Sequence, residues 1–103
     1  MLQVTDQQVG TWFHSSFSTP IEFDIKIVEF AMDNGYDIKK DVWEADKPIF
    51  LSGQATKEMI DDLQILADYS VGFLNEEVLP ENFYFMFDDA GDLILQKDIN
   101  LTE

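Results

Sequence analysis

Residues 56–79 show the clearest helical pattern in the chain. Apolar side chains recur there at steps of three, four and seven residues, which places them in one stripe along a helix. Thr56 is suited to cap the start of this helix, and Pro80 lies just beyond its end. The stripe, predicted to be buried, comprises Met59, Ile60, Leu63, Leu66, Ala67, Ser70, Phe73 and Leu74. The opposite side carries Asp61, Asp62, Ile65, Asp68 and Tyr69.

Two apolar runs after Pro80 predict a β-hairpin. Residues 83–87 and 93–96 are separated by five residues that include Gly91, and glycine readily adopts the left-handed conformation that such a turn requires. Both runs are apolar at almost every position. We therefore expect either that both faces of the sheet are covered or that one face contacts a partner.

The N-terminal half predicts one helix and leaves a second segment open. Residues 5–17 are expected to form a helix, since Thr5 and Gln8 have the spacing of a capping box. Residues 21–33 fit two patterns, because their apolar positions match both the strand period and the helix period. The helix is favoured, since Pro20 suits a first helical position and Asn34-Gly35 suits a helix end.

Residues 37–52 divide into a polar segment and a short apolar run. The polar segment 37–47 is expected to be a loop or a short helical turn. Residues 48–52 form a short apolar run before Gly53 and are expected to be a third strand, with Pro48 placing it at a sheet edge or at the first position of the strand.

These elements predict a single α+β domain spanning residues 1–103. Two or three helices pack on a small antiparallel sheet that includes a C-terminal β-hairpin. The conformation of residues 21–33 decides between three helices on a small sheet and two helices on a larger one.

The charge of the chain is its most unusual property. Twenty-one acidic residues are opposed by six lysines and no arginine, giving a net charge of −15. Such a composition argues against direct binding of nucleic acid or of an anionic membrane. There is no cysteine, so disulfides and thiol-based zinc sites are excluded, and no apolar run approaches 20 residues. We expect a soluble, cytoplasmic protein.

Residues suited to catalysis or metal binding do not form a known motif. His14 is the single histidine and lies beside Ser15 and Ser16, but no orienting carboxylate is near in sequence. The acidic segment 88–92 does not have the ligand spacing of an EF-hand, and a hairpin turn explains its Asp and Gly residues. We predict no enzymatic activity, no cofactor and no metal site.

Two functions of different classes remain. The first is a non-catalytic acidic protein that inhibits or sequesters a basic partner, a nuclease or nucleic-acid-binding protein, as toxin-immunity proteins and DNA-mimicking anti-restriction or anti-CRISPR proteins do. Rows of carboxylates on a helix resemble a line of phosphates, and the charge exceeds the magnitude of roughly 2–8 usual for small soluble domains. The predicted partner-binding residues are Glu58, Asp61, Asp62, Ile65, Asp68, Tyr69, Glu76, Glu77, Asp88, Asp89 and Asp92.

The second function is a small regulatory or structural module that associates through its apolar hairpin and helix. The acidic residues would then serve solubility alone. A homodimer is left open by the sequence, as are the identity of the partner and the choice between an immunity and a DNA-mimic role.

Overall fold

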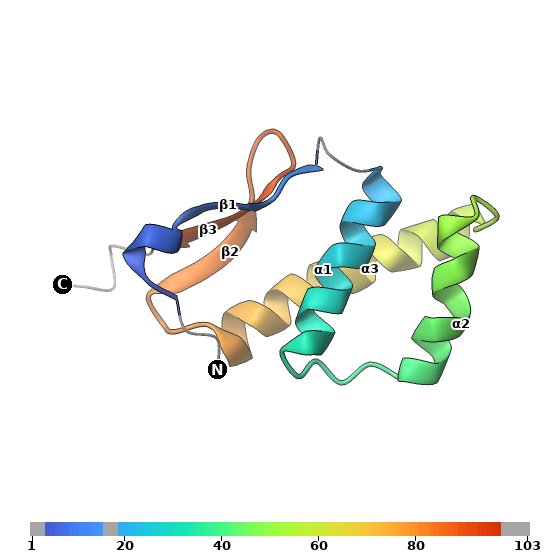
Figure 1. Cartoon of the computed structure of the whole chain (residues 1–103), viewed down its shortest axis with the longest axis horizontal. Helices are drawn as coiled ribbons and strands as arrows, with labels where there is room; N and C mark the ends of the chain where they lie inside the picture. Colours follow the sequence, from blue (N-terminus) through green and yellow to red (C-terminus); the bar gives the residue numbers. More distant parts are fainter. Residues whose placement is uncertain (1–3, 16–18, 98–103) are drawn as a thin grey trace.

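Three helices and a three-stranded antiparallel sheet make up the part of the chain that the computed structural model describes, residues 4–15 and 19–97 (Figure 1). The predicted α+β class is confirmed. The elements are β1 (Gly10–Phe13), α1 (Pro20–Asp33), α2 (Lys40–Leu51), α3 (Lys57–Phe73), β2 (Phe83–Phe87) and β3 (Leu93–Lys97). A short 3-10 turn, η1 (Asp6–Gln8), precedes β1, and a π-helical turn, η3 (Leu74–Val78), continues α3.

The sheet lies at one end of the molecule and α2 at the other, with α1 and α3 crossing between them (Figure 1). The strand order is β1-β3-β2, so the C-terminal strand occupies the centre of the sheet. Helices α1 and α3 pack extensively against each other. One continuous core joins the three helices, η3, β2 and β3, and the partly buried Trp12 and Phe13 of β1 pack against it. The buried core residues are Phe23, Ile25, Ile27, Val28, Ala31, Trp43, Phe50, Leu63, Ala67, Val71, Leu74, Val78, Leu79, Phe83, Phe85, Leu93 and Leu95.

The helices predicted to begin at Thr19 and at Thr56 both form with the expected threonine caps. Thr19 caps α1 by accepting a hydrogen bond from the Glu22 N–H (3.2 Å), and Pro20 occupies the first helical position. The prediction of a helix for residues 21–33 is therefore confirmed. Thr56 caps α3 in the same way by accepting from the Met59 N–H (3.2 Å).

The predicted helix over residues 5–17 is wrong within the described residues; residues 16–18 lie outside them. The capping-box contact does form, since the Thr5 N–H donates to Gln8 Oε1 (2.8 Å), but it supports only the single turn η1. Gly10 then adopts a φ of 131°, which no helix accommodates. The chain continues as β1, whose backbone pairs with β3.

A β-bulge in β1 explains how this short strand contributes to the core. The register changes between Thr11 and Phe13, so that Trp12 is an additional residue opposite β3. As a result, two consecutive aromatic rings both contact Phe30 of α1, with ring centroids 5.9 Å apart for Trp12 and 5.5 Å for Phe13. Packing of these partly buried rings against the core favours the strand over the helix that the local pattern predicts.

The predicted third strand over residues 48–52 is also wrong, because those residues form the end of α2. Trp43 and Phe50 lie two helical turns apart and are both buried, which fixes the segment as a helix. Pro48 lies inside this helix and leaves one backbone hydrogen bond unmade. The segment 37–47, expected to be a loop or a short helical turn, is helical from Lys40 onward. A three-stranded antiparallel sheet does form, with β1 as its third strand.

The hairpin forms as predicted, with Gly91 in the left-handed region (φ 85°). Asn75 lies beside it, in η3. Its side chain accepts from the Phe85 N–H (2.6 Å) and donates to the Phe85 carbonyl (3.0 Å). The same side chain thus satisfies two backbone groups of β2 on the side away from β3, as a neighbouring strand would.

Candidate interaction surface

The outward face of α3 is acidic and also exposes two large apolar side chains. Asp61, Asp62 and Asp68 are exposed, and between them Ile65 is 50% exposed and Tyr69 65% exposed. Glu58 is exposed one turn before this group. On the other side of the helix, Leu63, Ala67, Ser70 and Val71 are buried. We call Glu58, Asp61, Asp62, Ile65, Asp68 and Tyr69 the α3 face. No helix or strand of the described residues covers this face.

The carboxylates of the α3 face have no lysine partner within the described residues. The ion pairs found in residues 4–15 and 19–97 involve Asp6, Glu29 and Asp92. The sequence explains this, since no basic residue occurs between Glu58 and Gln96. The negative field of this face is consequently not neutralised from within that part of the molecule.

The remaining predicted site residues fall into two groups. Glu76 and Glu77 are exposed in η3, at the C-terminal end of α3. Asp88, Asp89 and Asp92 lie in the turn between β2 and β3, where Asp89 is exposed. Asp88 accepts from the N–H groups of Ala90 (3.0 Å) and Asp92 (2.9 Å), as an aspartate that stabilises a turn does.

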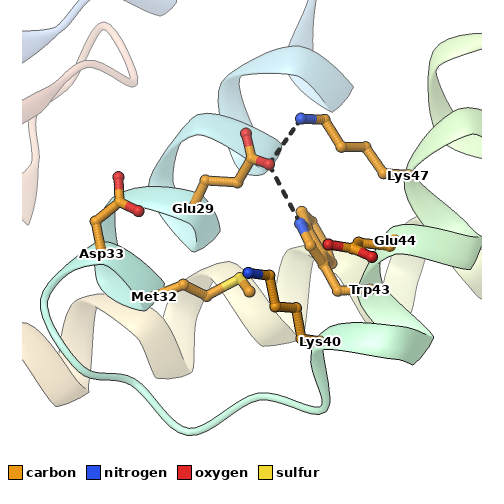
Figure 2. Close-up of a pocket in the computed structure, with 7 residues that line it drawn as sticks. All are labelled: Glu29, Met32, Asp33, Lys40, Trp43, Glu44 and Lys47. Atoms are coloured by element: carbon orange, nitrogen blue, oxygen red, sulfur yellow. Dashed lines mark hydrogen bonds and ion pairs between the residues drawn. The ribbon is translucent and has the colours of Figure 1, made fainter.

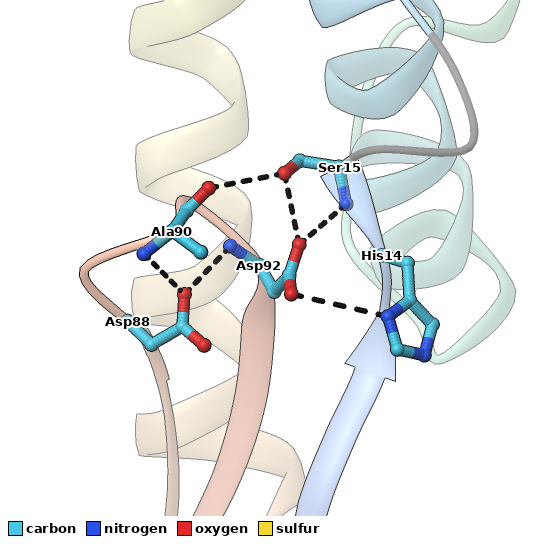
Figure 3. A network of polar contacts seen from close by, with 5 residues as sticks. All are labelled: His14, Ser15, Asp88, Ala90 and Asp92. Carbon is cyan, nitrogen blue, oxygen red and sulfur yellow. Dashed lines mark hydrogen bonds and ion pairs between the residues drawn. The ribbon is translucent and has the colours of Figure 1, made fainter.

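Asp92 joins the hairpin turn to the end of β1 (Figure 3). One of its oxygens accepts from both the Ser15 N–H (2.7 Å) and the Ser15 hydroxyl (2.8 Å), and the other lies 3.8 Å from His14 Nδ1. The two hydrogen bonds from Ser15, followed by the charge of His14, lower the pKa of Asp92. Asp88 and Asp92 thus have internal partners, unlike the acids of the α3 face.

The meeting of serine, histidine and aspartate in Figure 3 differs from a nucleophilic triad. In a triad the hydroxyl donates to the imidazole and the imidazole donates to the carboxylate. Here the Ser15 hydroxyl contacts the Asp92 carboxylate directly and also the Ala90 carbonyl (3.2 Å). The geometry suits a structural link between β1 and the hairpin turn.

A cavity of about 460 Å³ brings the α3 face, α1 and the hairpin turn together. It is lined by Ser15, Pro20, Phe23, Asp24, Gln64, Asp68, Ala90 and Gly91. Asp24 is half-buried there, one turn before the buried Ile27 and Val28 of α1. Burial, and secondarily the negative charge of Asp68, raise the pKa of Asp24 to about 6.

Asp24 is the notable residue that sequence reasoning missed. The helical period places Asp24 toward the buried side of α1 if residues 21–33 are helical. Its proximity to Asp68 depends on how α1 and α3 cross, and no local signal encodes that crossing.

A second cavity, of about 380 Å³, lies between α1 and α2 (Figure 2). Glu29 accepts there from Lys47 Nζ (2.7 Å) and from the indole N–H of Trp43 (3.3 Å). Trp43 is only 5% exposed, so it belongs to the core and does not serve as a surface anchor. Glu29 and Lys47 neutralise each other, and this cavity therefore adds little to the acidic surface.

Comparison with known proteins identifies no relative: no family model, curated protein or solved structure matches the chain.

Within residues 4–15 and 19–97 no group of three or more His, Asp or Glu side chains is placed to hold a metal ion. No described helix is long and apolar enough to cross a membrane.

Proposed function

We propose that this chain is a non-catalytic binding protein that docks the α3 face on a basic partner, a nuclease or other nucleic-acid-binding protein, and thereby inhibits or sequesters it. The observation that supports this function best is the α3 face itself. It combines carboxylates that have no lysine partner in the described residues with two exposed apolar side chains on one rigid helix.

The charges of this face favour a basic partner. Residues three or four apart on a helix lie about 5–6 Å from each other, so the α3 acids form a row of closely spaced negative charges. Such a row attracts the same lysine and arginine side chains that contact nucleic-acid phosphates. Electrostatic attraction of this kind accelerates association and makes it sensitive to salt.

The two apolar residues of the α3 face provide binding free energy that its charges alone do not. Exposed ion pairs contribute only about 0–1 kcal/mol each, because water and salt screen them. Interfaces gain most of their affinity from a few central residues, among which tyrosine is enriched. Tyr69 and Ile65 lie amid the acids, where a basic protein that docks on the charges would bury them.

The self-associating module remains a second candidate, supported by exposed apolar residues away from α3. On α2, Val42 is 53% exposed and Leu51 55% exposed, and on β2 Met86 is 40% exposed. Association through these residues would bury apolar area, and salt would not weaken it.

Capture of a partner by matched charge variants separates these functions. The face variant carries Glu58→Gln, Asp61→Asn, Asp62→Asn and Asp68→Asn. The control variant neutralises four exposed acids of α1, α2 and the loop between them, through Asp33→Asn, Asp37→Asn, Asp41→Asn and Glu44→Gln. Both variants change the net charge by the same amount, so a general effect of charge cancels between them.

The proposed function predicts that the wild type and the control variant retain a basic nuclease or nucleic-acid-binding protein from cell lysate at low salt. The face variant should bind that protein about 10- to 100-fold more weakly, as expected for the loss of four exposed ion pairs. Added DNA or RNA should compete with the wild type. Equal losses in both variants, or retention of nothing but further copies of the chain, would contradict the proposal.

A further inference from the structure

The cavity between α1, α3 and the hairpin turn has the chemistry of a cation site. Two carboxylates line it, Asp24 from α1 and Asp68 from α3, and no lysine does. Gln64 contributes an amide group, which can accept through its oxygen or donate through its nitrogen. The Ser15 hydroxyl already donates its proton to Asp92 or Ala90, so toward the cavity its oxygen can only accept. Acceptors therefore outnumber donors around this space.

The cavity also has an apolar part. Pro20 and Phe23 of α1 line it beside the carboxylates. The side chains of arginine and lysine combine a cationic group with an aliphatic stem that packs on apolar surface. An aromatic residue next to carboxylates suits the stem and the charge of such a side chain together.

We propose that this cavity is an anchor site for one cationic side chain, an arginine or a lysine, of a basic partner protein. The inference rests on the proposed function and deepens it, because Asp68 belongs both to the α3 face and to the cavity. A partner docked on the α3 face therefore lies next to the cavity opening. Charge complementarity selects the occupant: an anion would meet two carboxylates.

The raised pKa of Asp24 is consistent with this assignment. Burial, and secondarily the negative charge of Asp68, make the ionised form of Asp24 less favourable and raise its pKa to about 6. A bound guanidinium or ammonium group would supply a positive charge and lower the pKa of Asp24. The charged groups among the lining residues are Asp24 and Asp68, since the segment after β1 and the hairpin turn contribute only Ser15, Ala90 and Gly91.

A titration with single amino-acid derivatives tests the site without the partner. The ¹⁵N-labelled chain would be titrated with N-acetyl-arginine amide at pH about 7.5, and N-acetyl-citrulline amide, which is neutral and similar in shape, serves as the control. Saturable shifts are expected at the amides of Ser15, Gln64, Asp68 and Gly91 with arginine and not with citrulline. Equal shifts with both compounds, or shifts spread evenly over the acidic surface, would overturn the proposal.

Variants then connect the cavity to partner binding. Asp24→Asn should weaken arginine binding about 5-fold, the loss of about one partly exposed ion pair. It should weaken binding of the captured partner to a similar degree. Asp46→Asn, which removes one charge from α2, is the matched control and should change neither measurement.

The two proposals fail in different ways. Arginine binding in the cavity without any captured basic partner would contradict the proposed function and leave the cation site standing. A captured partner that is weakened by the substitutions of the α3 face but not by Asp24→Asn would overturn the anchor site alone.

Discussion

Replacing Asp24 by asparagine should stabilise the protein at neutral pH. Folding places this carboxylate in a half-buried position beside Asp68 and raises its pKa from 3.8 to about 6. Above pH about 6 the folded state thus contains a charge that burial disfavours. Asparagine has nearly the same shape without the charge, so the variant avoids that cost.

The size of the effect follows from the pKa shift. One pKa unit corresponds to about 1.4 kcal/mol, so a shift to about 6 would correspond to about 3 kcal/mol for a fully buried group. Asp24 is half-exposed, and solvent screening reduces this to about 1 kcal/mol. For a domain of this size, 1 kcal/mol raises Tm by about 4 °C.

The sign of the pH dependence is fixed by linkage. Between pH about 4 and about 6 the folded chain binds a proton at Asp24 that the unfolded chain has lost, so the contribution of Asp24 to stability falls as pH rises. The free-energy difference between Asp24→Asn and the wild type should be near zero at pH about 4. It should grow to about 1 kcal/mol by pH about 7 and then remain constant.

Urea unfolding of both proteins from pH about 4 to about 8, followed by the fluorescence of Trp12 and of the buried Trp43, measures this difference. Asp62→Asn is the matched control, because it removes one charge from the exposed α3 face. Its effect should stay within about 0.5 kcal/mol at every pH. The same profile for both variants, or a destabilised Asp24→Asn at pH about 7.5, would refute the reasoning.

Three further substitutions test other parts of the structure. Asn75→Ala removes both hydrogen bonds to Phe85 and should lower the free energy of unfolding by about 2 kcal/mol in urea titrations, whereas a loss under about 0.5 kcal/mol would show that the edge contact is unimportant. Asp92→Asn should destabilise the protein at neutral pH, because it weakens the acceptor for Ser15. Folding lowers the pKa of Asp92 below its ordinary value of 3.8. The stability that the ionised Asp92 contributes is therefore fully present above pH about 3.8 and is lost as the pH falls through the lower pKa of the folded state. Thermal unfolding curves of Asp92→Asn and the wild type that still differ in strong acid would contradict this account. Tyr69→Ala should weaken partner binding about tenfold in calorimetric titrations and leave Tm unchanged, and unaltered affinity would remove Tyr69 from the interface.

The elements that the sequence predicts correctly are those with local signals at both ends. The helices α1 and α3 have threonine caps whose hydrogen bonds form as expected, and Asn34-Gly35 ends α1. The hairpin has an Asp- and Gly-rich turn between two apolar runs. In each case the short-range preferences agree with the tertiary packing.

Where the prediction fails, a distant partner decides the structure. The capping contact between Thr5 and Gln8 forms, yet the chain continues as β1, because β3 supplies backbone partners from more than 75 residues away. The apolar run at residues 48–52 is too short to distinguish strand from helix by periodicity. Burial of Phe50 in line with Trp43 decides in favour of helix.

The difference between local sequence signals and contacts with distant residues also applies to the candidate surface. The helical period alone places Asp61, Asp62, Ile65, Asp68 and Tyr69 on one side of α3, and the structure leaves that side exposed. The link from Asp92 to Ser15 and the approach of Asp24 to Asp68 join elements that are distant in sequence. Neither has a local signature, and both require the packed fold to be seen.

The salt dependence of partner binding tests the central claim most directly. The dissociation constant of the captured partner would be measured by calorimetry from about 50 to about 500 mM NaCl. Docking through the α3 face predicts a dissociation constant that rises by at least about tenfold over this range. The rise should be smaller for the face variant, which lacks four of the acidic charges. A dissociation constant that is the same at all salt concentrations, or a steep salt dependence that the face variant fully retains, would contradict the account.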